Sequence, residues 1–194
     1  MKARASAPAP FPAAQSWLLD NPLTRAMAAR FVRQLDLTPG MHVLDVGCGP
    51  GRLTIPIARA VGNDGKVVAM DVQQEMLARV ARRAAAARLS NVRTLRASAG
   101  GAELPSRSFD LALLAYVLGE IPSDGRSAAI GEIARALRPD GRLVVAEGAT
   151  DPHRQSVDAV RDLAAAAGLR LDATRRGPLN TVMTLRPELV RADR

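Results

Sequence analysis

Residues 43–52 read Val-Leu-Asp-Val-Gly-Cys-Gly-Pro-Gly-Arg, and this segment says more about the architecture than any other part of the chain. Its first four residues, Val43–Val46, form a short apolar run interrupted by Asp45, which predicts a buried strand. Glycines follow at positions 47, 49 and 51, and Leu53–Val61 predicts a helix in which Pro56 favours a kink or a later start. A glycine-rich turn between a strand and a helix lets a ligand approach the main-chain N–H groups.

Strands and helices alternate through the rest of the chain. The expected strands are Lys66–Met70, Val92–Arg96, Asp110–Ala115, Arg142–Glu147, Leu169–Ala173 and Thr181–Arg186, and the expected helices between them are Gln73–Arg88, Asp124–Leu137 and Ser156–Ala167. Ahead of residue 43, Asn21 and Pro22 begin a further predicted helix, with an apolar stripe at Leu23, Met27, Phe31 and Leu35. This alternation predicts an α/β fold with a mostly parallel sheet, which binds ligands at the carboxyl ends of its strands.

Length and composition predict one domain. The chain has 194 residues, of which 47% are hydrophobic, enough for one core and too few for two full domains. We expect a mobile tail over residues 1–15, a helical lid segment over 16–38 and the main domain over 39–188. No apolar run approaches the roughly 20 residues of a membrane span, and prolines near the start argue against a secretory signal. Cys48 is the single cysteine, which favours a cytoplasmic location.

The net charge of +8 raises the question of an acidic partner such as nucleic acid. The basic residues are spread along the whole chain, and only Lys2 and Lys66 are lysines, which indicates a compositional bias towards arginine. A nucleic-acid partner is therefore disfavoured, although it stays open as a substrate class. A homodimer also stays open.

Two carboxylates flank the glycines and indicate the ligand. Asp45 precedes Gly47 by two residues, where it would repel a pyrophosphate and attract an ammonium group. Asp71 comes 20 residues after Gly51, at the end of the next predicted strand, where a carboxylate can accept hydrogen bonds from ribose hydroxyls. S-adenosylmethionine carries both an amino-acid end and a ribose, so it is the predicted cofactor. A simpler role, capping of nearby backbone N–H groups, stays open for both acids.

Four segments together resemble the class I S-adenosylmethionine-dependent methyltransferases: Val43–Arg52, Val67–Leu77, Ser108–Leu118 and Leu137–Glu147. They are most similar to the branch of small-molecule enzymes related to the ubiquinone and menaquinone biosynthesis methyltransferases. The resemblance covers residues 21–186 and implies a Rossmann-like three-layer sandwich, whose seven-stranded sheet is mostly parallel with an antiparallel last strand.

The resemblance also implies roles for individual residues. The glycine loop would cradle the methionine part of the cofactor, Asp45 would hold its amino group and Asp71 its ribose. The remaining implied cofactor contacts are Gly47, Cys48, Gly49, Gly51, Val72, Met76, Ser98, Ala99 and Ala115. Val72 and Met76 would line the adenine pocket, and Ala115 and Tyr116 would lie along the methionine and the substrate.

Two positions depart from the family pattern. The family usually has an Asp-Ala pair after the strand that corresponds to Val92–Arg96, whereas this chain has Ala97-Ser-Ala99. Ser98 or Glu103 could replace that adenine-binding acid. Relatives often carry a histidine where this chain has Gly119-Glu120, so the resemblance does not define the acceptor.

Methyl transfer is an in-line displacement in which the cofactor supplies the reactivity and the protein supplies position. If a base takes part, Tyr116 and Glu120 are the candidate catalytic residues, since both follow a strand at the expected cleft. The simpler interpretation of Tyr116 is that it lines the cleft without a catalytic role. Glu147 is expected at the cleft rim or as a structural hydrogen-bond partner. His42 and His153 are the only histidines, and no cluster of metal ligands is evident.

The favoured function is O-, N- or C-methylation of a small molecule. An RNA or protein methyltransferase, a non-catalytic S-adenosylmethionine-binding protein and, more distantly, an NAD-dependent reductase stay open.

Overall fold

The computed structural model describes residues 21–188. The tail expected over residues 1–15 and the first part of the expected lid, residues 16–20, lie outside this range. The helices are α1 (Pro22–Arg33), α2 (Thr54–Val61), α3 (Gln74–Ala86), α4 (Arg126–Ala136) and α5 (Val157–Ala165). The strands are β1 (His42–Val46), β2 (Lys66–Asp71), β3 (Val92–Arg96), β4 (Phe109–Ala115), β5 (Leu137–Gly148), β6 (Leu169–Arg176) and β7 (Asn180–Pro187). Every predicted element is present.

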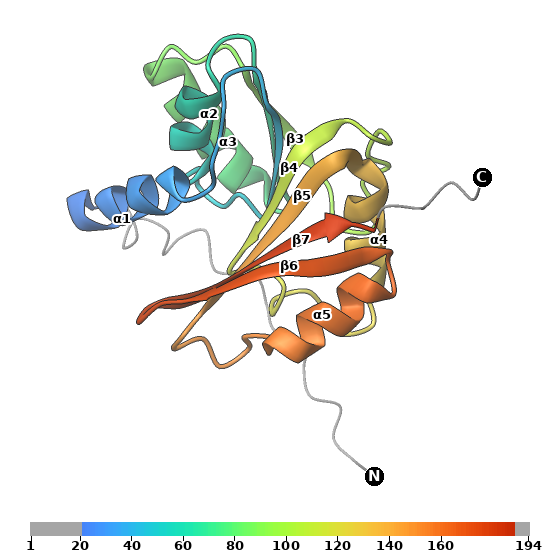
Figure 1. The fold of residues 1–194 in the computed structure, drawn as a ribbon. Coiled ribbons are helices and arrows are strands. Elements are labelled where there is room, and N and C mark those ends of the chain that lie inside the picture. The colour runs from blue at the N-terminus through green and yellow to red at the C-terminus, as the bar shows by residue number, and fades with distance from the viewer. Residues whose placement is uncertain (1–20, 189–194) are drawn as a thin grey trace.

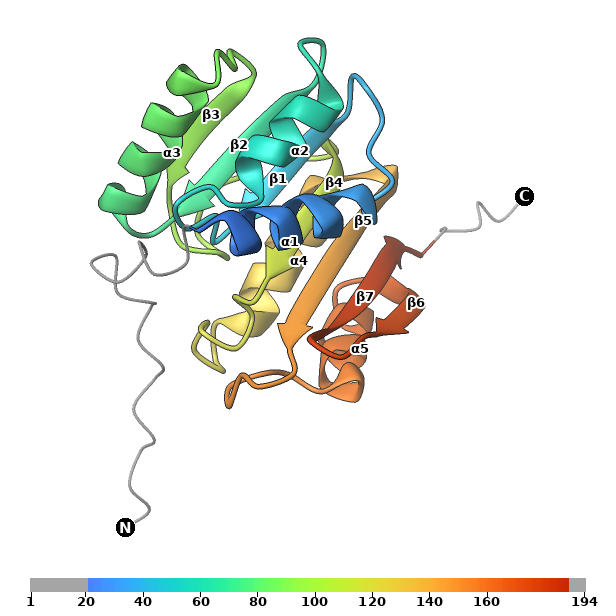
Figure 2. The same ribbon diagram turned by 90° about the vertical axis from the view of Figure 1, so that its left-hand side faces the viewer.

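The strands form one seven-stranded sheet in the order β3-β2-β1-β4-β5-β7-β6 (Figures 1 and 2). Pairs among β1 to β5 are parallel, and β7 runs antiparallel to both β5 and β6. This topology confirms the predicted Rossmann-like fold with an antiparallel last strand. The strand order reverses between β1 and β4, and parallel sheets bind their ligands beside such a reversal.

Helices cover both faces of the sheet, which makes three layers. Figure 2 shows α1, α2 and α3 over one face, with α4 and α5 behind it. Successive residues of a strand point to opposite faces, so Val43 packs in the cluster with Ile57 of α2, while its neighbour Leu44 packs in the cluster with Ile130 of α4. The central strands are therefore apolar on both faces, as expected for a covered parallel sheet.

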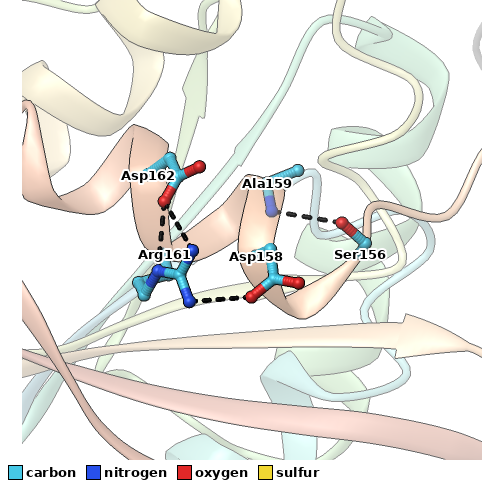
Figure 3. A network of polar contacts seen from close by, with 5 residues as sticks. All are labelled: Ser156, Asp158, Ala159, Arg161 and Asp162. Atoms are coloured by element: carbon cyan, nitrogen blue, oxygen red, sulfur yellow. Dashed lines mark hydrogen bonds and ion pairs between the residues drawn. The ribbon is translucent and has the colours of Figure 1, made fainter.

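Side chains cap the N-terminal ends of two helices. The side chain of Asn21 accepts a hydrogen bond from the N–H of Thr24 at 3.0 Å, so Asn21 caps α1 as predicted. Ser156 caps α5 by accepting from the N–H of Ala159 at 3.1 Å, and Arg161 forms ion pairs on the same helix (Figure 3). Pro56 lies in the first turn of α2, where its missing N–H removes no helical bond, so the predicted later start is correct.

Three segments differ from expectation. Strand β5 begins at Leu137 rather than Arg142, because Leu137 already pairs with Phe109 ahead of a register shift. Strand β6 runs on to Arg176 rather than Ala173, after an irregularity near Leu171. The apolar stripe predicted for the first helix is buried only in its second half: Phe31 of α1 and Leu35 just beyond it are buried, and Leu23 and Met27 are exposed. The longer β6 and the exposed start of α1 both bear on the site below.

Among residues 21–188, none of the helices combines the length and the apolar character that crossing a membrane would require.

Candidate functional site

A cavity of about 1250 Å³ opens at the carboxyl ends of β1, β2 and β4. One end is lined by the loop after β1 and by the acids Asp45 and Asp71. The other end is lined by Tyr116, by α1 and by the turn that joins β6 to β7. The cavity therefore lies where the strand order reverses, as the predicted topology requires.

The predicted site residues gather in this cavity. Its lining includes Asp45, Gly47, Cys48, Gly49, Asp71, Val72, Met76, Ser98, Ala99, Ala115, Tyr116 and Glu120. Their contacts with a cofactor or an acceptor stay predictions. Gly51 stands apart, because it is buried and is not part of the lining, and a Cβ there would lie 3.1 Å from Cγ2 of Val80. Its small size lets α3 pack closely against the loop.

The loop glycines have positive φ angles for which L side chains are poorly suited: +65° at Gly47, +51° at Gly49 and +83° at Gly51. Their surroundings differ. A Cβ at Gly47 would lie 2.5 Å from Cγ2 of Val117, whereas a Cβ at Gly49 would meet nothing within 4 Å. Gly49 is thus the loop glycine that borders open space, where the backbone can be approached closely by a ligand.

Asp71 holds the loop in place. Its Oδ2 accepts from the N–H of Gly49 at 2.9 Å, and its Oδ1 accepts from the N–H of Gln73, the N-cap residue of α3, at 2.9 Å. The simpler capping role is therefore present. Each carboxylate oxygen can accept a second hydrogen bond, so this arrangement also leaves acceptors for the ribose hydroxyls predicted at Asp71.

Asp45 is buried, with 2% of its surface exposed, and its Oδ2 accepts from the hydroxyl of Thr54 at 2.6 Å. Burial raises the pKa of Asp45 to about 7, the Thr54 hydrogen bond opposes this rise, and the negative charge of Asp71 adds to it. A cationic ligand group would favour the ionised form. The pKa of the Cys48 thiol is raised by burial and by both acids, which makes Cys48 a small lining residue rather than a nucleophile.

The loop after β3 contains the position at which this chain lacks the family's adenine-binding acid. Glu132 of α4 accepts from the N–H groups of Gly100, Ala102 and Leu104 at 2.8, 3.2 and 3.2 Å. Ser98 lines the cavity, whereas Glu103 is exposed and is absent from the lining. Of the two replacements considered for the adenine acid, Ser98 is therefore the one that lies at the cavity.

Tyr116 combines an unusual backbone with a defined hydroxyl. Its φ is +64°, a conformation that costs a bulky residue about 1 kcal/mol or more. Its hydroxyl accepts from Nδ2 of Asn180 at 2.9 Å, which ties the end of β4 to the start of β7. Non-glycine residues with such angles cluster at ligand sites.

Glu147 differs from expectation. It is buried but is not part of the cavity lining, and neither carboxylate oxygen has a hydrogen-bond partner among the described residues. Burial raises its pKa to about 7, the backbone N–H of Gln155 and the charge of Arg126 lower it in part, and the charge of Asp151 adds to the rise. Both expected roles, at the cleft rim and as a structural hydrogen-bond partner, are therefore wrong. His42 and His153 also lie outside the lining.

Several lining residues were not predicted from the sequence: Arg30, Gln34, Arg52, Gln73, Arg175, Arg176, Leu179 and Asn180. One signal could have found the last four. Strand β6 runs in the same direction as β5, since both are antiparallel to β7, so the β6–β7 turn lies at the carboxyl edge of the sheet. That is the edge at which the site was expected.

A parallel sheet with a glycine loop after β1 and an acid at the end of β2 defines a Rossmann-like nucleoside-binding protein. The methyltransferase domain family matches residues 43–141, which is half of the chain. The chain belongs to this family and, with it, to the S-adenosylmethionine-dependent methyltransferases.

Curated relatives share the core of the domain. The chain is 36% identical over 118 residues to demethylmenaquinone methyltransferase of Symbiobacterium thermophilum, covering 60% of this chain and 46% of that protein. It is 34% identical over 122 residues to nocamycin O-methyltransferase of Saccharothrix syringae, covering 61% and 42%. The chain thus spans about half the length of the curated relatives it matches.

Solved structures agree on the fold. A S-adenosylmethionine-dependent methyltransferase from Aquifex aeolicus has a TM-score of 0.80 at 24% identity, covering 90% of this chain and 98% of that one. Magnesium protoporphyrin IX methyltransferase from Synechocystis PCC 6803 has a TM-score of 0.67 at 20% identity, covering 86% and 79%.

Proposed function

We propose that this chain binds S-adenosylmethionine at the glycine-loop end of the cavity and transfers its methyl group to a small-molecule acceptor bound at the Tyr116 end. One observation carries the proposal: the cavity measures about 1250 Å³ and joins both ends. Sites for a single small ligand span roughly 300–1,000 Å³. The cavity therefore has room for a cofactor and a small acceptor side by side.

The residues at the glycine-loop end fit an amino acid joined to a nucleoside. Asp45 offers a carboxylate to the ammonium group, Gly49 leaves open space beside the backbone, and Asp71 retains acceptors for ribose hydroxyls. When bound, the cofactor supplies a methyl group activated by a sulfonium, and the C–S bond breaks as the acceptor atom bonds to the methyl carbon. The protein's contribution is then mainly alignment of the two reactants.

Tyr116 and Glu120 line the cavity beyond the glycine loop and are the proposed groups on the acceptor side. Asn180 fixes the Tyr116 hydroxyl through a hydrogen bond at 2.9 Å, so the phenol is oriented before any acceptor binds. Glu120 offers a carboxylate that can take the proton that the acceptor loses. The names of the two curated relatives, which mention demethylmenaquinone and nocamycin, support a small molecule as the acceptor class.

Calorimetric titration with S-adenosylhomocysteine and with NADH tests the cofactor. We expect S-adenosylhomocysteine to bind and NADH not to bind; binding of NADH alone would contradict the proposal. A screen of small phenols, amines and carbon acids with methyl-labelled cofactor then tests transfer. Micromolar binding of S-adenosylhomocysteine without turnover of any acceptor would instead support a non-catalytic binding protein.

Two conservative variants test the acceptor side. Tyr116→Phe and Glu120→Gln should lower kcat/KM for an acceptor found in the screen by about tenfold or more, while the affinity for S-adenosylhomocysteine stays unchanged. Unchanged turnover in both variants would mean that these residues line the cavity without taking part in the reaction.

A further inference from the structure

Exposed apolar side chains concentrate in the cavity. The large hydrophobic residues exposed in the described part of the chain are Leu23, Met27, Val72, Tyr116 and Leu179, and all except Leu23 line the cavity. Met27 and Tyr116 are each 41% exposed and Leu179 is 61% exposed. These three come from α1, the end of β4 and the β6–β7 turn, which together form the end assigned to the acceptor. Apolar surface gathered in a concave site marks a place where an apolar ligand binds.

Three arginines line this end, together with two acids, Glu120 and Asp124, from the segment after β4. Among the described residues, α1 and the β6–β7 turn contribute Arg30, Arg175 and Arg176 to the lining and no carboxylate. None of these three guanidinium groups forms an ion pair or a side-chain hydrogen bond within residues 21–188. Most arginines elsewhere on β5 to β7 behave differently: for example, Arg186 pairs with Asp172 at 3.0 Å.

Strand register places Arg175 on the side of the sheet that faces α1. Arg175 pairs with Val182, and directly paired residues share a face of the sheet. Val182 packs against the hydrophobic cluster of α1 and α2. Arg175 therefore projects to the face covered by α1, where Arg30 lines the same cavity. Figure 1 shows α1 and the free end of the β6–β7 hairpin on the same side of the molecule.

We infer that the acceptor is an apolar ring compound that carries a carboxylate or another oxyanion, held between Arg30 and Arg175. The apolar body packs on Met27, Tyr116 and Leu179, and the anion forms charge-assisted hydrogen bonds with one or both guanidinium groups. This inference rests on the proposed function, because it assigns this end of the cavity to the acceptor.

Two fluorescent probes that differ by one anionic group test the inference. 1-Anilinonaphthalene-8-sulfonate carries a sulfonate, and N-phenyl-1-naphthylamine is the same ring system without it. Both are titrated into the protein with and without saturating S-adenosylhomocysteine. We expect the sulfonate probe to bind about tenfold more tightly than the neutral probe, a preference of the size that one charged hydrogen bond gives.

Matched variants test whether Arg30 and Arg175 cause the preference for the sulfonate probe. Arg30→Met together with Arg175→Met should weaken the sulfonate probe about tenfold and leave the neutral probe unchanged, whereas the Lys versions of both should retain most of the preference. Arg82→Met removes an exposed charge of α3 that is not in the lining and should change nothing. Equal binding of both probes to the native protein, or a preference that survives the double Met variant, would overturn the inference.

Calorimetry with S-adenosylhomocysteine on the same proteins separates the two proposals. If S-adenosylhomocysteine binds and the probes show no anion preference, the inference fails and the proposed function stands. If S-adenosylhomocysteine does not bind, the proposed function fails whatever the probes show. If the double Met variant loses S-adenosylhomocysteine affinity, the arginines hold the cofactor's carboxylate and the inference is wrong.

Discussion

Gly49 and Gly62 offer a matched pair of glycines for testing the cofactor site. Both have positive φ, +51° and +68°, and a Cβ at either position would meet nothing within 4 Å. Gly49 lines the cavity, whereas Gly62 lies beyond the far end of α2. Gly49→Ala should therefore cost about 1 kcal/mol of stability from backbone strain, and Gly62→Ala about 1–3 kcal/mol, because Gly62 combines its positive φ with a ψ of −175°. Only Gly49→Ala should weaken S-adenosylhomocysteine binding, by tenfold or more, as measured by calorimetry.

Gly47→Ala serves as the contrasting variant, because its Cβ would lie 2.5 Å from Val117 and should destabilise the fold more than Gly49→Ala does. Equal S-adenosylhomocysteine affinity in Gly49→Ala and Gly62→Ala would mean that the ligand does not approach the backbone at residue 49.

If Asp45 holds the ammonium group as proposed, cofactor binding should depend on pH. Its pKa is raised to about 7, mainly by burial, so below pH 7 the carboxyl is largely neutral and attracts an ammonium group weakly. Affinity for S-adenosylhomocysteine should therefore increase about tenfold from pH 6 to pH 8 and then level off, since one proton is released. Asp45→Asn keeps the Thr54 partner and should bind weakly at every pH. Calorimetry at pH 6, 7 and 8 measures the slope, and a flat native profile would refute this assignment.

The sequence predicts the acids of the site better than the other residues. Asp45 and Asp71 lie at fixed distances from the glycines along neighbouring parallel strands, so local spacing already places them at one edge. The positions of Arg175 and Asn180 depend on where β6 ends and β7 begins, and the face on which Arg175 lies also depends on the register shift near Leu171. The positive φ of Tyr116 likewise comes from tertiary contacts, since the sequence around it contains no turn signal.

At the scale of elements, Glu132 connects α4 to the loop after β3. Its carboxylate accepts hydrogen bonds from three backbone N–H groups between residues 100 and 104. The same loop contains Ser98 and Ala99, which line the cavity. Glu132→Ala should cost about 2–3 kcal/mol in urea unfolding, because charged hydrogen bonds are lost. It should also speed amide hydrogen exchange at Gly100, Ala102 and Leu104 and weaken cofactor binding.

Glu132→Gln retains one acceptor oxygen and should fall between the native protein and Glu132→Ala. Amide exchange that stays slow in Glu132→Ala would show that the loop is held by other contacts.

Element boundaries were predictable where local chemistry sets them. Asn21 and Ser156 cap their helices, and Pro56 allows only an early position in α2. The start of β5 at Leu137 was not predictable in the same way, since Pro139 and Gly141 predict a turn there. Pairing of Leu137 with Phe109 extends the strand across that turn, and such pairing depends on the neighbouring strand rather than on local sequence.

For the whole molecule, the two ends of the cavity differ in how far apart their residues lie in the chain. The glycine-loop end comes mainly from residues 45–53 and 70–76, which are adjacent strand–helix units. The end proposed for the acceptor combines α1, the end of β4 and the β6–β7 turn, which only the folded sheet brings together. The sequence consequently predicts the cofactor and leaves the acceptor open.

Stability should depend on pH through two buried acids. Burial raises the pKa of Asp45 and of Glu147 to about 7 in the folded chain, from 3.8 and 4.5. A raised folded pKa gives stability that is complete below the unfolded pKa and is lost as the pH rises through the folded one. The free energy of unfolding should thus fall between pH 5 and pH 8, with Glu147 contributing on the order of 2 kcal/mol to the fall.

The net charge of +8 opposes this trend, because protonation at lower pH adds to self-repulsion. The effect of the buried acids is therefore best measured by comparing the pH profiles of variants. Glu147→Gln removes one of the two titrating groups and should make the pH profile of urea unfolding less steep, whereas Asp64→Asn, at an exposed turn outside the core, should leave the profile unchanged. Since Glu147 lies outside the cavity, Glu147→Gln should keep the pH dependence of S-adenosylhomocysteine binding that Asp45 provides. Loss of both pH dependences in Glu147→Gln would mean that the two acids titrate as one coupled group.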